Sequence, residues 1–250
     1  EIFTKAGFTV DHLHTLTQDE IKARIHEYDG WVVRSRSKAT ADIIEKATKL
    51  RVIGRAGVGI DNVDVEAASK RGIIVMNTPG GNTTSTAEHA IAMMMAIARK
   101  IPQASASMHG GKWDKNAFMG AEFRNKTLGI LGLGRIGQEV CKRMKAFEMQ
   151  VIAYDPFVSP DMMKQMGVEP MTVDEICKRA DFITIHTPLS PETKKLINAE
   201  RLATMKKSVR LVNCARGGIV DEGALAEALK AGKIAGAALD VFEQEPIPAD

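Results

Sequence analysis

Aromatic residues, strong net charge and long apolar stretches are all scarce in this sequence. Aromatic side chains make up 5% of the 250 residues, and the formal net charge is only +3, with basic residues in scattered pairs rather than runs. Such a chain offers no basic surface interleaved with aromatic residues for nucleic acid. The longest apolar run, residues 90–98, is too short for a membrane helix, which needs about 20 residues. We therefore expect neither a nucleic-acid partner nor a membrane span.

Cysteine is also rare, and its spacing argues against two kinds of site. Cys141, Cys177 and Cys214 lie far apart in the sequence and form no CxxC pair. Neither a zinc site nor a disulfide framework is indicated, and we expect no metal. The first fifteen residues also lack the apolar segment of a secretory signal. A reduced, cytoplasmic setting fits these absences best.

Short β-branched segments alternate with helical patterns along most of the chain. This alternation predicts an α/β protein with parallel sheets covered by helices. In the first part we expect strands at 31–33, 52–53 and 73–75, with a helix over 40–47. Breaker residues at 77–82 indicate a domain boundary at about residue 78. From residue 127 the pattern predicts six strand–helix units, with strands at 128–132, 151–154, 167–169, 182–186, 209–213 and 235–240.

A long helix is expected between these two parts. Ser85 and Glu88 form the Ser-x-x-Glu pattern of a capping box, which places the start of the helix at Ser85. Residues 90–98 are apolar on every side of a helix, so we expect them to be buried. A second subunit is one candidate for the surface that covers them. A polar loop that contains glycine is expected at 109–114.

A glycine fingerprint lies at the first turn of the six-strand region. Gly132, Gly134 and Gly137 form GxGxxG after a predicted strand and before a helix with one apolar face. In dinucleotide-binding folds these glycines permit a tight turn, the approach of a pyrophosphate and close packing of helix on sheet. The second strand ends at Asp155, 18 residues after Gly137; an acid at this place binds ribose hydroxyls and repels a 2′-phosphate, which favours NAD over NADP. The alternative is a glycine-rich turn with an incidental surface aspartate.

Four longer motifs carry a resemblance to a known family. They are 186–193 (HTPLSPET), 212–222 (VNCARGGIVDE), 54–64 (GRAGVGIDNVD) and 237–242 (AALDVF). The first two resemble signatures of the D-isomer-specific 2-hydroxyacid dehydrogenases, and the resemblance covers essentially the whole chain. Within that family the chain is most similar to the members that oxidise 3-phosphoglycerate to 3-phosphohydroxypyruvate with NAD, in the first step of serine biosynthesis.

The resemblance implies two domains and an oligomer. Residues 1–78 would form a flavodoxin-like substrate-binding domain that is incomplete because its first strand is missing. Residues 79–250 would form a Rossmann-type NAD-binding domain, with the active site in the cleft between the two. A homodimer or homotetramer formed through the NAD-binding domain is also implied. The family's general base, a histidine, is expected beyond Asp250, so the chain would be truncated at both ends.

The resemblance also assigns roles to individual residues. Arg216 would hold the substrate carboxylate and polarise the C2 oxygen, although the residues alone are equally compatible with a surface arginine that flanks a helix. Glu245 would be the carboxylate that orients the histidine base. The implied cofactor-binding residues are Gly132, Gly134, Arg135, Ile136, Gly137, Asp155, His186, Thr187, Pro188, Cys214, Ala215 and Asp240. The implied substrate-binding residues are Arg34, Arg55, Ala56, Gly57 and Asn82, with donors expected from the backbone amides near Ala56 and Gly57.

One departure from the family and two rival functions stay open. Lys115 stands where the family commonly has an arginine that contacts the substrate phosphate of the facing subunit. A lysine keeps the positive charge but cannot form the paired hydrogen bonds that a planar guanidinium makes with a phosphate. Cys214 also suits an unreactive, packed thiol. NAD-binding transcriptional corepressors share the fold and would need an apolar groove instead of Arg34 and Arg55. A glycerate or glyoxylate dehydrogenase of the same family would gain no affinity from a substrate phosphate.

Overall fold

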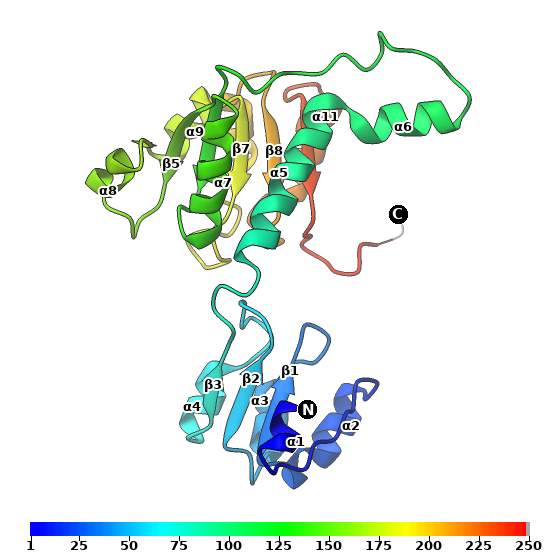
Figure 1. The fold of residues 1–250 in the computed structure, drawn as a ribbon, viewed down its shortest axis with the longest axis vertical. Coiled ribbons are helices and arrows are strands. Elements are labelled where there is room, and N and C mark those ends of the chain that lie inside the picture. Colours follow the sequence, from blue (N-terminus) through cyan, green and yellow to red (C-terminus); the bar gives the residue numbers. More distant parts are fainter. Residues whose placement is uncertain (249–250) are drawn as a thin grey trace. The chain divides into compact units, whose positions relative to one another are not determined.

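The computed structural model describes residues 1–248, and the chain divides into two compact units (Figure 1). The first unit comprises Glu1–Asn82, and the second begins at Thr83. Each unit has its own parallel sheet and its own apolar core, so each is described by itself. No helix within residues 1–248 is long and apolar enough to cross a lipid bilayer.

The first unit is a three-stranded parallel sheet with helices packed on one face. Its strands are β1 (Gly30–Val33), β2 (Val52–Arg55) and β3 (Ile74–Met76), paired in the order β1-β2-β3. Its helices are α1 (Ile2–Lys5), α2 (Gln18–Arg24), the 3₁₀ turn η1 (Ile25–Glu27), α3 (Ala41–Lys46) and α4 (Val65–Lys70). A capping box starts α2, because the Thr17 hydroxyl accepts from Glu20 N while the Glu20 carboxylate accepts from Thr17 N.

The two faces of this small sheet differ in their exposure to solvent. Side chains alternate between faces along a strand, and Val33 and Ile53 are buried in one core with residues of α2, α3 and α4. The opposite face presents Val32, Ile74 and Met76, whose side chains are 58%, 61% and 55% exposed. Within the described residues, helices therefore bury one face of this sheet and leave apolar side chains exposed on the other.

Six parallel strands form the sheet of the second unit. They are β4 (Thr127–Leu131), β5 (Gln150–Tyr154), β6 (Glu169–Pro170), β7 (Phe182–Ile185), β8 (Arg210–Asn213) and β9 (Gly236–Leu239). Their order, β6-β5-β4-β7-β8-β9, runs outward in both directions from β4 and β7, as in a doubly wound dinucleotide-binding fold. All nine strands that the sequence predicts are present, within two residues of the predicted positions. The predicted α/β class with a Rossmann-type sheet is confirmed.

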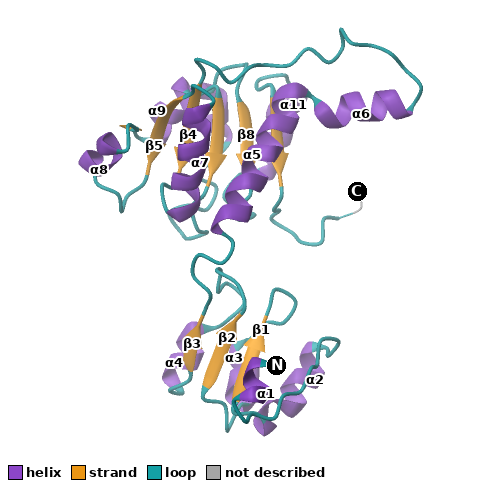
Figure 2. Ribbon diagram, in the orientation of Figure 1, coloured by secondary structure: helices purple, strands orange, loops and turns teal. Residues whose placement is uncertain are grey.

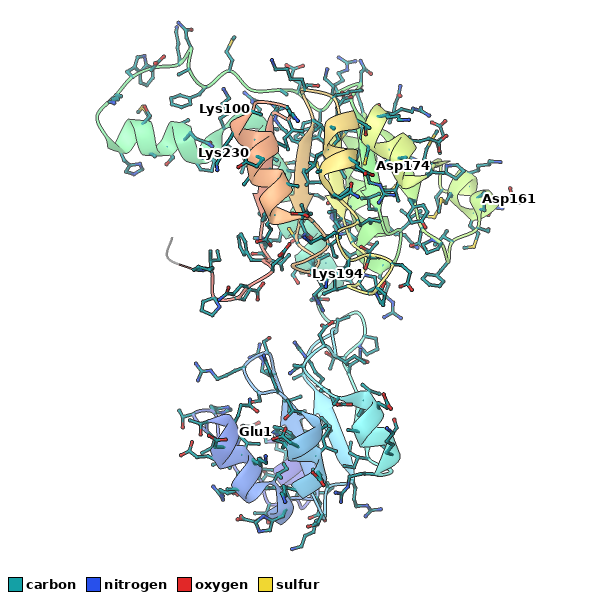
Figure 3. All side chains as sticks on the ribbon, turned by 180° about the vertical axis from the view of Figure 1, so that it is seen from behind. Glu1, Lys100, Asp161, Asp174, Lys194 and Lys230 are labelled. Carbon is teal, nitrogen blue, oxygen red and sulfur yellow. The ribbon has the colours of Figure 1, made fainter. Side chains whose placement is uncertain are left out.

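Helices cover both faces of this sheet (Figure 2). On one face, α5 (Thr83–Arg99), α7 (Arg135–Ala146) and α8 (Pro160–Gln165) share an apolar core with Ile130 of β4. On the other face, α9 (Val173–Arg179), α10 (Ala199–Thr204) and α11 (Glu222–Lys230) share a second core with Leu131. A sheet buried on both faces needs continuous apolar strands, and β7 is buried at every position. Charged residues such as Asp161, Asp174 and Lys230 lie on the exposed sides of these helices (Figure 3).

The start of α5 differs from the prediction. The helix begins at Thr83, so Ser85 lies in its first turn and is not the N-cap of a box with Glu88. The Glu88 carboxylate lies 3.8 Å from the guanidinium of Arg143 on α7 instead. The Ser-x-x-Glu motif placed the helix start wrongly because residues 83–86 all carry side-chain hydroxyls, and each of these residue types is a favourable N-cap.

Within this chain α5 is buried on one side, and a second helix follows it. Only one face is fully buried, through Ala87, Ala90, Ile91, Met94 and Ala98. Ala92 is exposed in the single chain, so burial of residues 90–98 on every side requires a second subunit and stays a prediction. Helix α6 (Ile101–His109) was not predicted, because none of its residues is buried and it carries no apolar stripe.

Gly129 of β4 shows how closely α9 packs on the sheet. A Cβ at this position would overlap Cγ2 of Ile176 and lie 3.1 Å from Cβ of Ala180. We predict that Gly129→Ala lowers the free energy of unfolding by about 1–3 kcal/mol, the usual cost of overpacking a core. Urea denaturation followed by circular dichroism measures this change. Gly236→Ala is the control, because no atom lies within 4 Å of a Cβ there, and equal losses in both variants would contradict the prediction.

Candidate functional site

Two loops leave the carboxyl edge of the six-stranded sheet in opposite directions. The chain leaves β4 through residues 132–134 into α7, and it leaves β7 through residues 186–188 toward α10. Strands β4 and β7 are hydrogen-bonded neighbours, whereas α7 and α10 belong to the cores on opposite faces. In doubly wound folds, ligands bind in the crevice outside the strand ends at such a switch point. The glycine fingerprint therefore lies where the topology favours a binding site.

The two loops come into close contact at Gly132. This residue has a φ of 95°, a left-handed conformation that favours glycine. A Cβ there would also lie 2.8 Å from the backbone carbonyl of His186 and 2.9 Å from Thr187 N. At Gly137, the first turn of α7 approaches so closely that a Cβ would overlap the Gly132 carbonyl oxygen. These two glycines make the tight turn and the close packing that the fingerprint predicts.

Gly134 differs from the other two glycines. It is the N-cap of α7 with a φ of −71°, and no atom lies within 4 Å of a Cβ at this position. Nothing inside the unit therefore requires glycine at this point. The N–H groups of Arg135 and Ile136 belong to the first turn, and the first intrahelical bond runs from Gln138 N to the Gly134 carbonyl. Open space beside first-turn N–H groups is the arrangement in which a helix N-terminus binds a phosphate.

Side chains hold the glycine loop from two sides. Leu133 N donates to the Asp155 carboxylate at 2.7 Å, and the Leu133 carbonyl accepts from the side-chain amide of Gln138 at 3.0 Å. The second carboxylate oxygen of Asp155 accepts from Phe157 N at 2.8 Å. Asp155 therefore orients the glycine loop, in addition to any contact with a ribose. The sequence analysis did not predict that Gln138 holds the loop, because its side-chain amide reaches the Leu133 carbonyl only once α7 has formed.

The residues at this edge fit a bound dinucleotide. The Thr187 hydroxyl is buried and has no hydrogen-bond partner among the described residues. Such a group is costly unless a polar ligand or water satisfies it. The Thr187 hydroxyl, the first-turn N–H groups of α7 beside the space at Gly134 and the half-buried Asp155 carboxylate are polar groups at this edge that a dinucleotide can contact.

His186 is held as a neutral histidine beside the glycine loop. Its Nε2 lies 3.0 Å from the Thr184 hydroxyl, and burial of the ring lowers its pKa to about 4. Its backbone N donates to the Leu131 carbonyl and joins the β7 loop to β4. An uncharged, largely enclosed ring suits the wall of a pocket better than acid–base chemistry at neutral pH.

The rest of the 186–193 motif closes the loop on itself. The Thr193 hydroxyl donates to the Pro188 carbonyl at 2.6 Å, and Ser190 N donates to the same hydroxyl oxygen at 2.8 Å. Thr193 therefore fixes the turn that follows Thr187 and Pro188. The motif contained this threonine, but its spacing alone did not reveal the bond.

The catalytic candidates lie on the next two loops along the same edge. Arg216 follows β8 by three residues, and Glu245 follows β9 by six. The β8 loop is held by Asn213, whose side chain is only 2% exposed. Its Nδ2 donates to the Arg216 carbonyl at 2.9 Å, and its Oδ1 accepts from Ala215 N at 3.0 Å. Asn213 thus fixes the turn that carries Arg216, a role that sequence analysis missed.

Gly217 lets the two loops touch. A Cβ at Gly217 would overlap the Phe242 carbonyl and would lie 2.7 Å from Glu243 N. The Glu245 carboxylate accepts from Phe242 N at 3.0 Å, and its side chain is exposed. The structure therefore brings the backbone next to Arg216 against the loop that carries Glu245.

Cys214 and Asp240 occupy equivalent places at the ends of β8 and β9. The Cys214 thiol is buried, with its sulfur 3.4 Å from that of Met93 on α5. Burial, together with the Asp240 carboxylate, raises its pKa to about 12, so the thiol is protonated and unreactive. A carboxylate oxygen of Asp240 lies 3.4 Å from Nε2 of His89. His89 was not among the predicted site residues.

In the first unit, the candidate arginines lie at the carboxyl edge of the sheet. Arg55 ends β2 and Arg34 directly follows β1. The guanidinium of Arg55 donates to the Ala56 carbonyl at 2.9 Å and to the Ser35 hydroxyl at 3.4 Å, while its Nε is buried without a partner among the described residues. The side-chain amide of Asn62 donates to the Arg34 carbonyl at 2.8 Å. Ser35 and Asn62 therefore help to position the two arginines, and sequence analysis named neither.

The backbone amides of Ala56 and Gly57 are not free donors, contrary to expectation. Ala56 N donates to the Val33 carbonyl at 2.9 Å, and Gly57 N donates to the Arg55 carbonyl at 2.8 Å. The first bond continues the pairing of β1 and β2 past the strand ends, and the second closes a tight turn within the segment that follows β2, so both amides are used inside the unit. The Arg55 side chain also passes through the position that a Cβ of Gly57 would occupy. Asn82, the last predicted substrate residue, is exposed at the end of the unit.

Comparison with known proteins agrees with this geometry. Residues 91–250 match the family model of the D-isomer-specific 2-hydroxyacid dehydrogenases, NAD-binding domain. The chain is 54% identical, over 98% of its length, to D-3-phosphoglycerate dehydrogenase of Rattus norvegicus. Over 92% of its length it is 56% identical to the protein of the same name from Methanocaldococcus jannaschii. It also matches the D-lactate dehydrogenase structure from Aquifex aeolicus, complexed with NAD and lactic acid, with a TM-score of 0.86, 31% identity and coverage of 98% of this chain and 74% of that one.

The chain therefore belongs to the D-isomer-specific 2-hydroxyacid dehydrogenases, and its second unit carries the family's NAD-binding domain. The family resemblance that the motifs suggested is confirmed, as is NAD as the cofactor of this domain. The chain covers 46% and 44% of the two curated relatives named above, which is about half of their length.

Gly134 offers a test of the phosphate position that separates binding from folding. We predict that Gly134→Ala weakens NAD binding at least about tenfold, since the methyl group enters the space beside the first-turn amides and hinders charge-assisted hydrogen bonds. Stability should change by no more than about 1 kcal/mol, the cost of a poorer N-cap. Isothermal titration with NAD and urea denaturation measure the two effects. Gly137→Ala should lose both stability and binding, and unchanged NAD affinity in Gly134→Ala would place the pyrophosphate elsewhere.

His186 should make the unit sensitive to acid. Its pKa is about 4 in the folded protein and about 6.5 when unfolded, so the unfolded state takes up a proton first as the pH falls. The stabilisation is complete above the unfolded pKa and is lost as the pH falls toward the folded pKa, with a slope of up to about 1.4 kcal/mol per pH unit. Urea denaturation across this range should show a shallower slope for His186→Gln. The exposed His109 provides the control, and a wild-type slope in His186→Gln would refute the assignment.

Proposed function

We propose that the protein oxidises 3-phospho-D-glycerate at C2 to 3-phosphohydroxypyruvate with NAD, which is the first step of serine biosynthesis. The observation that carries the proposal is the distribution of arginines over the two units. Arg216 stands beside the NAD crevice, and Arg34 and Arg55 share the sheet edge of the first unit. This set suits a small substrate with two anionic ends, a carboxylate and a phosphate. The two curated relatives described above bear the name D-3-phosphoglycerate dehydrogenase.

When bound, NAD supplies the acceptor for the hydride that leaves C2 of the substrate. The backbone amides of Arg135 and Ile136 would bind the pyrophosphate in the space beside Gly134. The Asp155 carboxylate would accept hydrogen bonds from the ribose hydroxyls, and its charge would repel a 2′-phosphate, which favours NAD over NADP. The adenosine side would be lined by His186, Thr187 and Pro188, and the nicotinamide by Cys214, Ala215 and Asp240.

Arg216 and Glu245 would perform the protein's part of the chemistry. The guanidinium of Arg216 would bind the substrate carboxylate and polarise the neighbouring C2 oxygen. Asn213 would keep the turn in place while the charge on that oxygen changes. Glu245 would orient a histidine general base and raise its pKa, so that the base accepts the C2 hydroxyl proton as the hydride departs.

Arg34, Arg55 and Asn82 would bind the substrate from the first unit. Arg55 already has one guanidinium nitrogen buried without a partner among the described residues, a donor that an anion would satisfy. Lys115 is exposed in the segment after α6, where its charge is available to a phosphate. We further propose a cytoplasmic homodimer or homotetramer formed through the NAD-binding unit, with no nucleic-acid or membrane partner.

Phosphate recognition is the sharpest test of this proposal. We predict that Arg34→Ala and Arg55→Ala each weaken 3-phosphoglycerate by about 1.5–3 kcal/mol, the value of a hydrogen bond to a charged group. D-glycerate should be affected much less by the loss of the arginine that binds only the phosphate. In the full-length protein, which should include the histidine base, the KM of NADH formation with each substrate measures the difference. Arg36→Ala is the control because this exposed arginine donates to the His14 carbonyl.

Three results would contradict the proposal in different ways. Equal weakening of both substrates by both variants would make the arginines structural. Turnover of glycerate or glyoxylate at the same efficiency as 3-phosphoglycerate would favour a sister dehydrogenase. NAD binding by the full-length protein without oxidation of any of these acids, together with peptide binding, would favour a corepressor.

A further inference from the structure

Three potential metal ligands from distant parts of the second unit converge on one point. His89 belongs to α5, Cys214 follows β8 and Asp240 follows β9. A ring nitrogen, the thiol sulfur and a carboxylate oxygen all lie within 4.8 Å of one another. Helix α5 packs against both strands, so regular elements of the fold position all three groups. The sequence spacing of these residues predicted no metal site.

The separations of these groups suit tetrahedral coordination. With bonds of about 2.0–2.1 Å to nitrogen and oxygen and about 2.3 Å to sulfur, tetrahedral zinc holds neighbouring N and O ligands about 3.4 Å apart and N and S ligands about 3.6 Å apart. The observed distance from His89 Nε2 to Asp240 Oδ1 is 3.4 Å. The other ligand atoms lie within 4.8 Å of one another, so side-chain rotation must bring them closer to reach these values.

The chemistry of the ligands selects a soft transition metal. Thiolate and imidazole suit zinc and similar ions, whereas magnesium and calcium prefer all-oxygen sites. Met93 lies one turn after His89 on α5, and its sulfur is 3.4 Å from that of Cys214. This thioether adds a second polarisable sulfur beside the thiol. A bound cation would also supply the positive charge that stabilises a buried thiolate, which the protein alone does not stabilise.

We propose that His89, Cys214 and Asp240 bind a zinc-class ion and that this ion excludes NAD. The metal site itself stands on the geometry above, whereas the competition rests on the proposed function, which assigns Cys214 and Asp240 to the nicotinamide. The Asp240 oxygen that would accept a hydrogen bond from the nicotinamide carboxamide is then a metal ligand. The ion and the nicotinamide cannot occupy this corner together, so zinc acts as an inhibitor competitive with NAD.

Cobalt(II) tests the metal site without any enzymatic reaction. Added to protein treated with EDTA, Co²⁺ should give the visible bands of tetrahedral coordination and a thiolate-to-cobalt charge-transfer band, which Cys214→Ser abolishes. His89→Gln should weaken Co²⁺ and Zn²⁺ binding at least about tenfold, because even residues that only orient metal ligands contribute on that scale. His109→Gln, an exposed histidine on α6, should bind as the wild type does. Wild-type affinity in His89→Gln, or a spectrum without the thiolate band, would overturn the site and leave an ordinary His89–Asp240 ion pair.

NADH fluorescence tests the competition. Zinc should raise the apparent Kd for NADH in the wild type in proportion to its concentration, and the effect should shift to at least tenfold higher zinc in His89→Gln, which keeps its NADH affinity in EDTA. Magnesium should have no effect on either protein. Zinc that binds through the thiolate but leaves the Kd for NADH unchanged would overturn the competition. Failure of NADH to bind in EDTA would instead count against the proposed function, so the two failures are distinguishable.

Discussion

The second unit depends on a close backbone contact between the loop that follows β4 and the loop that follows β7. This contact leaves no room for a side chain on the loop after β4. A Cβ at Gly132 would lie 2.8 Å from the His186 carbonyl, and one at Gly137 would overlap the Gly132 carbonyl oxygen. Because both positions are glycine, α7 can start directly beside the end of β4. Its first-turn N–H groups then face the crevice where β4 and β7 send their helices to opposite faces.

Several side chains hold in place the loops that would bind the ligands. Asp155 accepts a hydrogen bond from Leu133 N, and Gln138 donates one to the Leu133 carbonyl. Asn213 donates to the Arg216 carbonyl and so fixes the turn that carries Arg216. Thr193 does the same for the loop that carries Pro188. Each bond fixes backbone before any ligand arrives, which lowers the ordering cost of binding. These loops are therefore preformed on the edge of one sheet. Loss of Gln138, Asn213 or Thr193 should weaken binding although none of the three is assigned a contact with the ligand.

Local sequence patterns predicted some parts of this fold well and others poorly. The central strands of the second unit were predicted closely, because strands buried on both faces are short, continuous apolar runs. The start of α5 was misplaced at Ser85, since four successive hydroxyl residues all suit an N-cap by type, and the helix begins two residues earlier, at Thr83. Helix α6 was missed because it buries nothing and so has no apolar stripe. The amides of Ala56 and Gly57 were expected to be free, but strand pairing with β1 already uses one of them.

The sequence by itself determined the fold class, the glycine fingerprint, the acid at Asp155 and the family, because each of these is encoded by residues close together in the chain. Only the tertiary structure decided which distant groups share a site. Asn213 becomes a holding residue for Arg216 because its side chain is buried at the end of β8. His89, Cys214 and Asp240 become one cluster because α5 packs across the ends of β8 and β9. Spacing along a chain reports neighbours within one element, whereas contacts between elements are set by how helices and strands bury their apolar faces.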